Sequence, residues 1–76
     1  MNKHWYQIDR RQDNGQLDGY DMVQANNFDT ALRSYLGDEY KDYNISKKQI
    51  NGRTVVTAHC PAETSSYLEI TRVIKQ

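Results

Sequence analysis

The chain is poor in cysteine and in long apolar runs, and both absences exclude classes of protein. Cys60 is the only cysteine among 76 residues, so an internal disulfide cannot form, whereas a small secreted domain usually needs several. No apolar stretch approaches the roughly 20 residues that span a membrane, and residues 1–7 lack the apolar core of a signal peptide. We therefore expect a cytoplasmic protein that neither enters nor crosses a membrane.

An excess of charge of either sign is missing too. Ten basic and ten acidic residues give a net charge of zero, whereas a dedicated nucleic-acid-binding protein usually has a strong basic excess. The charges are unevenly spread: residues 1–42 hold five cations and eight anions, a net charge of −3, and residues 43–76 hold five cations and two anions, a net charge of +3. A chain this short supports one hydrophobic core, so we expect a single domain over residues 1–76.

Catalytic and cofactor-binding patterns are absent as well. His59 and Cys60 are adjacent, so on a strand they point to opposite faces and cannot act together as base and nucleophile. With His4 they lack the pair spacings of zinc ligands, and the chain has no glycine-rich phosphate-binding pattern. We expect no enzymatic activity, no metal and no cofactor, and we interpret Cys60 as a small buried hydrophobe and His59 as a surface residue.

One helix is predicted by apolar residues that recur at helical spacing. They occupy positions i, i+3, i+4, i+7 and i+8, which places them on one stripe. Asn27 is a suitable N-cap and Gly37 a suitable residue just past the C-terminus. A helix of about ten residues is unstable alone in water, so the stripe must pack against other elements. The stripe consists of Phe28, Ala31, Leu32, Tyr35 and Leu36.

Alternating, β-prone segments predict strands on both sides of this helix. Residues 11–19 are rich in turn formers and are expected to be a hairpin loop. Asn51-Gly52 favours a two-residue hairpin turn, and counting outward from it puts Lys47 opposite Val56, a charged side chain on an otherwise apolar face. The predicted strands are residues 3–10, 20–25, 43–50, 53–60 and 66–74.

These elements indicate an α+β fold. It consists of a small antiparallel sheet of four to five strands with one helix packed on one face, in the chain order strand, strand, helix, strand, strand, strand. A domain of this size has a net stability of only about 3–5 kcal/mol. We expect the helix residues Phe28, Leu32, Tyr35 and Leu36 to pack on Tyr6, Ile8, Val23, Ile45, Ala58 and Ile70.

An acidic segment that contains tyrosine is the first candidate binding site. It follows Gly37, where the helix should end, so the core does not require its side chains. Tyrosine offers contact area at low entropic cost, and carboxylates steer a basic partner. We expect it to contact a protein partner, with the chain acting as a monomer or homodimer. The predicted protein-binding residues are Asp38, Glu39, Tyr40 and Asp42.

A basic hairpin is the alternative site. Lys47, Lys48 and Arg53 surround the predicted Asn51-Gly52 turn and could hold phosphates. Flanking charges are also a common way of keeping a hairpin soluble. The alternative interpretation of the chain is therefore a small nucleic-acid-associated regulatory module.

The layout around the helix resembles that of short proteins from phages and other mobile elements. In residues 23–32 a strand ending in Ala25 leads through a polar cap into a helix that has a second alanine, Ala31, six residues later. The segment Trp5-Tyr6-Gln7-Ile8 precedes this stretch. Some small anti-CRISPR proteins, which inhibit CRISPR effectors by binding them, are similar over roughly residues 20–60. The resemblance implies a non-enzymatic inhibitor that occupies a protein partner's surface.

Overall fold

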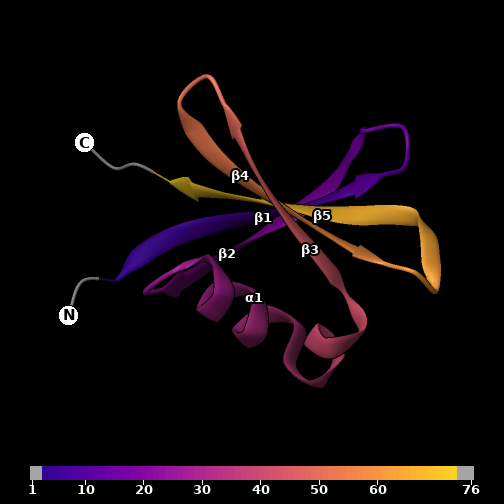
Figure 1. Cartoon of the computed structure of the whole chain (residues 1–76), viewed down its shortest axis with the longest axis horizontal. Coiled ribbons are helices and arrows are strands. Elements are labelled where there is room, and N and C mark those ends of the chain that lie inside the picture. Colours follow the sequence, from indigo (N-terminus) through magenta and orange to yellow (C-terminus); the bar gives the residue numbers. More distant parts are fainter. Residues whose placement is uncertain (1–2, 74–76) are drawn as a thin grey trace.

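The structure, a computed structural model, describes residues 3–73. Over this range the chain forms a five-stranded antiparallel sheet, one α-helix and a short 3-10 helix, which confirms the α+β expectation (Figure 1). Ile74, the predicted end of the last strand, lies outside the described residues. The elements are β1 (His4–Gln12), β2 (Leu17–Ala25), α1 (Phe28–Leu36), η1 (Gly37–Asp42), β3 (Asn44–Ile50), β4 (Arg53–Cys60) and β5 (Glu63–Val73).

The strand order is β2-β1-β5-β4-β3, so the last strand of the chain lies between the two hairpins. The buried side chains of β5 explain its central position, because the strands in the centre of a sheet are covered most fully. Ile8 of β1 pairs with Ile70 of β5, which pairs with Val56 of β4. These three side chains are at most 1% exposed and form the centre of the core. β2 and β3 are the two edges of the sheet.

The helix forms where the sequence predicts it, with both of its expected end signals. The side chain of Asn27 accepts a hydrogen bond of 2.8 Å from the backbone N–H of Thr30. Gly37 ends the helix with a φ of 59°, a left-handed conformation that glycine adopts without strain. Ala31 and Leu32 are buried against the sheet. No helix within residues 3–73 is long and apolar enough to cross a membrane.

The first hairpin is longer than predicted. β1 continues to Gln12 and β2 begins at Leu17, so the expected loop over residues 11–19 shrinks to the short turn between them. The backbone N–H of Gln12 donates to the carbonyl of Gln16, and a shift in register between Arg10 and Arg11 lets the pairing continue past Gly19. β5 is also longer than expected, because it begins at Glu63.

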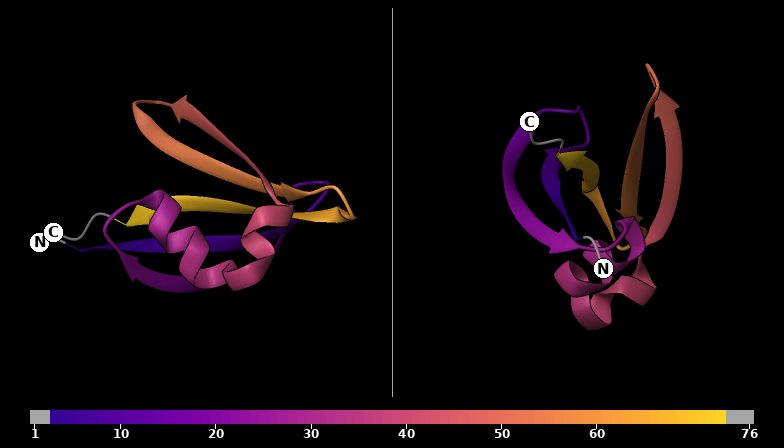
Figure 2. Two further views of the ribbon diagram at one scale, coloured as in Figure 1. Left: turned by 60° about the horizontal axis from the view of Figure 1, so that its bottom comes forward. Right: turned by 90° about the vertical axis from the view of Figure 1, so that its left-hand side faces the viewer.

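The second hairpin has the predicted register but not the predicted burial. Ile45 pairs with Ala58, and Lys47 pairs with Val56. However, Ile45 is 40% exposed, so its assignment to the core is wrong. Figure 2 shows the physical reason: the β3–β4 hairpin twists away from the helix, which leaves β3 uncovered. The same divergence leaves Lys47 in solvent and removes the conflict of a lysine on an apolar face.

Candidate functional site

Tyr40 was predicted to be a free surface residue, but its side chain contacts the helix and links η1 to α1. Its side chain is half-buried and packs against the core. Its hydroxyl donates to the carboxylate of Asp29, and the guanidinium of Arg33 lies 4.3 Å from the centre of its ring. Asp29 and Arg33 are joined in turn by an ion pair of 2.7 Å. The prediction that the core leaves Tyr40 free is therefore wrong.

This cluster shifts two pKa values in opposite directions. The hydrogen bond from Tyr40, followed by that from Arg33, lowers the pKa of Asp29, because both donors stabilise the ionised carboxylate. The same bond to Asp29 raises the pKa of Tyr40, because a phenolate could no longer donate. The contacts are local and solvent-exposed, and they position the acidic segment.

The three carboxylates of the segment remain in solvent. Asp38, Glu39 and Asp42 are exposed, and within residues 3–73 none of them takes part in an ion pair or a side-chain hydrogen bond. Gly37 turns the chain out of the helix, and η1 then presents all three within one short segment. The structure thus brings together the carboxylates that were predicted to form one surface.

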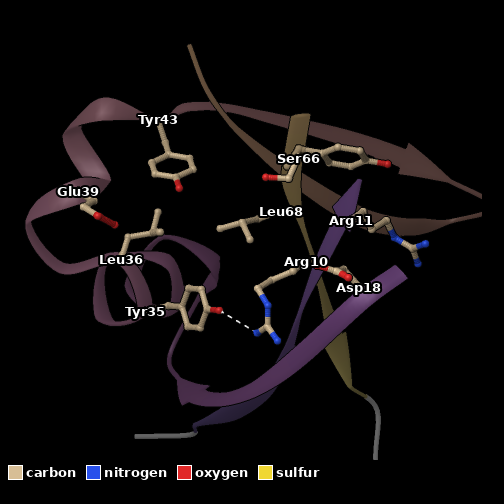
Figure 3. A pocket seen from close by; sticks show the side chains of 10 residues that line it. Arg10, Arg11, Asp18, Tyr35, Leu36, Glu39, Tyr43, Ser66 and Leu68 are labelled. Carbon is tan, nitrogen blue, oxygen red and sulfur yellow. Dashed lines mark hydrogen bonds between the residues drawn. The ribbon is translucent and has the colours of Figure 1, made fainter. Parts of the chain in front are cut away.

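A cleft of about 390 Å³ lies beside this segment, between the end of α1 and the sheet (Figure 3). Leu36, Tyr43 and Leu68 supply its apolar side chains. Glu39 of the acidic segment, Asp18 of β2 and Ser66 of β5 contribute polar groups. The cleft therefore joins an apolar surface to the predicted acidic site, and Glu39 belongs to both.

Arg10 is held at the side of this cleft. Its guanidinium lies 2.5 Å from the carboxylate of Asp21 and donates a bond of 3.3 Å to the hydroxyl of Tyr35, drawn in Figure 3. The same hydroxyl donates to Asp21 over 2.7 Å. Burial, followed by the bond to Asp21, raises the pKa of Tyr35. Three polar groups from β1, β2 and α1 thus form one connected network.

Gly19 makes room for this network. A Cβ at residue 19 would lie closer to a guanidinium nitrogen of Arg10 than van der Waals contact allows. Arg10 shares the core-facing side of β1 with Tyr6 and Ile8, since alternate residues of a strand point the same way. The sequence reasoning missed Arg10, although a charged residue in that apolar alternation was an available signal.

The basic hairpin residues do not gather on one surface. Lys47 and Lys48 are consecutive in β3 and point to opposite faces of the sheet. Lys47 shares the face of Val56, and Lys48 shares that of Val55. Arg53 extends instead toward β5, where it donates a hydrogen bond of 3.4 Å to the backbone carbonyl of Arg72. The predicted three-residue cluster is therefore divided.

The remaining candidates from the sequence, His59 and Cys60, do not themselves line the cleft. His59 is exposed and stacks on Tyr67 with ring centroids 5.1 Å apart. Cys60 is half-buried, so it is less enclosed than the buried hydrophobe that was expected. Among residues 3–73, no three His, Cys, Asp or Glu side chains are grouped so that they could hold a metal ion.

Comparison of the chain with protein-family models, with curated proteins and with solved structures finds no match. The site is therefore interpreted from its own geometry. That geometry is a small apolar cleft bordered by free carboxylates and by an arginine that is already neutralised by an aspartate.

Proposed function

We propose that this chain is a non-enzymatic binding protein, of the kind encoded by phages and mobile elements, that acts by occupying the surface of a protein partner. Its contact surface consists of the exposed carboxylates of η1 and the cleft beside them. The partner presents an apolar side chain flanked by basic residues. The carboxylates are Asp38, Glu39 and Asp42, and the apolar side chains of the cleft are Leu36, Tyr43 and Leu68.

The continuity between Glu39 and the cleft carries this proposal. Protein interfaces combine an apolar centre with a polar rim, and the cleft provides both within one small area. Insertion of an apolar side chain would remove Leu36 and Tyr43 from water, and each is half-buried before binding. The free carboxylates at the rim would speed the approach of a basic partner, an effect that weakens as salt is added.

The chemistry of the surface fits recognition better than catalysis. Arg10, which lines the cleft, is bound to Asp21 and Tyr35, so its position is set before a partner arrives. Such preorganisation lowers the entropic cost of binding. If the partner itself binds nucleic acid, the carboxylates of η1 would compete for its cationic site, as the resemblance to small anti-CRISPR proteins implies.

The test is affinity capture from a lysate of the native host, followed by titration of the purified partner. Baits are the wild type, a double variant Asp38→Asn with Glu39→Gln, and Asp13→Asn. The last variant removes an exposed carboxylate from the β1–β2 turn and is the control for charge alone. We expect the wild type and Asp13→Asn to capture the same protein, and the double variant to lose it as salt rises.

A second pair of variants tests the cleft without removing charge. Ser66 is exposed and lines the cleft, so Ser66→Phe should fill it and abolish binding. Ser46→Phe places the same bulk on the exposed strand β3 and should bind normally. Undiminished binding by Ser66→Phe and by the folded double variant would show that the functional surface lies elsewhere. Failure to capture any protein would reject the proposal itself.

A further inference from the structure

Two of the arginines within residues 3–73 differ from the other three in having no acidic partner. Arg10, Arg11 and Arg33 each form an ion pair with an aspartate, and Arg11 also reaches a glutamate. Arg53 and Arg72 are exposed and form no ion pair with any carboxylate of the described range. In a chain with as many acidic as basic residues, two neighbouring unpaired guanidinium groups form a locally positive site.

These two arginines line one groove of about 310 Å³, together with Phe28, Gly52 and Thr54. None of the five residues is acidic. The guanidinium of Arg53 donates to the backbone carbonyl of Arg72, so the two residues lie next to each other and both line the groove. Two like charges kept together without a counterion favour an anionic ligand, because an anion between them removes their mutual repulsion.

The positive surface continues along the second hairpin. Lys47 pairs with Val56, which pairs with Ile70, so these three lie on one face of the sheet. Arg72, two residues beyond Ile70, shares that face. Strand geometry, with a rise of about 3.3 Å per residue and a spacing of about 4.8 Å between strands, puts the Cα atoms of Lys47 and Arg72 about 12 Å apart. That separation fits a chain of anions better than a single one.

Phe28 supplies an aromatic surface at the same groove. The ring is half-buried and meets Tyr6 at 61°, with centroids 4.8 Å apart, so the packing against Tyr6 fixes its orientation. Aromatic rings beside a positive groove are the usual platform for unpaired bases. The acidic η1 lies at the opposite end of β3 from the hairpin turn (Figure 1), where its carboxylates do not repel a polyanion in the groove.

From these observations we infer that the groove between α1 and the β3–β4 hairpin binds single-stranded nucleic acid. Arg53, Arg72 and Lys47 contact phosphates, and Phe28 stacks on a base. Lys48, which the sequence groups with Lys47, takes no part because its side chain lines a different hollow, together with Ile50 and Val55. Arg53 shares the strand face of Lys48 by alternation, but it lies next to the hairpin turn and its side chain reaches across to β5 and lines the groove. This site is separate from the proposed protein-binding cleft, and either of the two can exist without the other.

The test is fluorescence anisotropy with a labelled oligothymidylate of about 20 nucleotides, longer than the usual site of a small domain. The full chain is titrated between about 50 and about 200 mM salt. Three phosphate contacts, each adding about 0.7 to the log-log salt slope for a single strand, predict an affinity loss of roughly 18-fold over that range. Loss of one contact should reduce this to roughly 7-fold.

The variants are Arg72→Gln, Arg53→Gln and Lys47→Gln, with Lys48→Gln as the matched control. All four side chains are exposed, so each variant should fold, and circular dichroism verifies this. We expect the first three to bind more weakly with a shallower salt slope, and Lys48→Gln to behave as the wild type. An equal effect of Lys48→Gln would overturn the assignment, because it would indicate attraction by charge alone.

A poly-glutamate peptide of similar charge distinguishes the other class of polyanion. If it displaces the oligonucleotide at equal charge concentration, the groove recognises acidic polypeptide and the inference is wrong. Absence of any oligonucleotide binding at about 50 mM salt overturns it as well. Neither result affects the protein-binding cleft, because its variants at residues 38, 39 and 66 change no residue that lines the groove.

Discussion

Replacement of Leu32 by alanine tests the central packing of the fold. Leu32 is 1% exposed and belongs to the core cluster. The substitution removes three carbon atoms, each worth about 0.8 kcal/mol of transfer free energy, or about 2.4 kcal/mol together. The cavity left behind raises the usual range to about 2–5 kcal/mol. A domain of this size has only about 3–5 kcal/mol in total, so the variant should be close to unfolding.

Ile45→Ala provides the matched control, since it also removes three carbon atoms. Because Ile45 is 40% exposed, at most about 60% of the same transfer term, about 1.4 kcal/mol, is lost, and no enclosed cavity forms. Urea unfolding followed by far-ultraviolet circular dichroism measures both values. Equal costs for the two variants, or an unchanged urea midpoint for Leu32→Ala, would refute the packing of the helix on the sheet.

Three further variants test local contacts. Asn27→Ala removes the helix cap and should lower the free energy of unfolding by about 1 kcal/mol, and an unchanged melting temperature would contradict that role. Asp29→Asn should lower the raised pKa of Tyr40, as measured by phenolate absorbance at high pH. The pKa of Asp29 is lowered in the folded protein, so the ionised carboxylate stabilises the fold above the ordinary carboxyl pKa. This stabilisation is lost as the pH falls through the folded pKa. The free energies of unfolding of Asp29→Asn and of the wild type should therefore converge in acid. Gly19→Ala should displace the guanidinium of Arg10 and also strain the backbone, because residue 19 has a φ of 159°. The part of the cost that comes from Arg10 should disappear once Arg10 is itself alanine, and the part that comes from the backbone should remain.

The exposure of the acidic segment was predicted in part. Its three carboxylates are exposed as expected, because a segment that follows the end of a helix has no stripe to bury. Tyr40 could not be placed from sequence, since its bond to Asp29 joins residues 11 positions apart across a turn whose direction Gly37 decides. The cleft escaped prediction for a related reason, because it lies between the helix end and strands from both ends of the chain.

The sequence by itself determined the elements whose signals are local. The helix is specified by its apolar stripe together with Asn27 and Gly37 at its ends, all within 11 consecutive residues. The register of the second hairpin follows from Asn51-Gly52, because a two-residue turn leaves one way to pair the strands. Side-chain alternation likewise places Lys47 and Lys48, which are neighbours on one strand, on opposite faces of the sheet.

Only the tertiary structure decided which strands lie next to one another and how far the helix covers them. An alternating strand has the same period at the edge of a sheet as at its centre, so the sequence could not reveal that β5 lies between β1 and β4. That insertion brings Arg72 beside Arg53. The twist of the sheet, which accumulates over all five strands, carries Ile45 beyond the reach of the helix and leaves it in solvent.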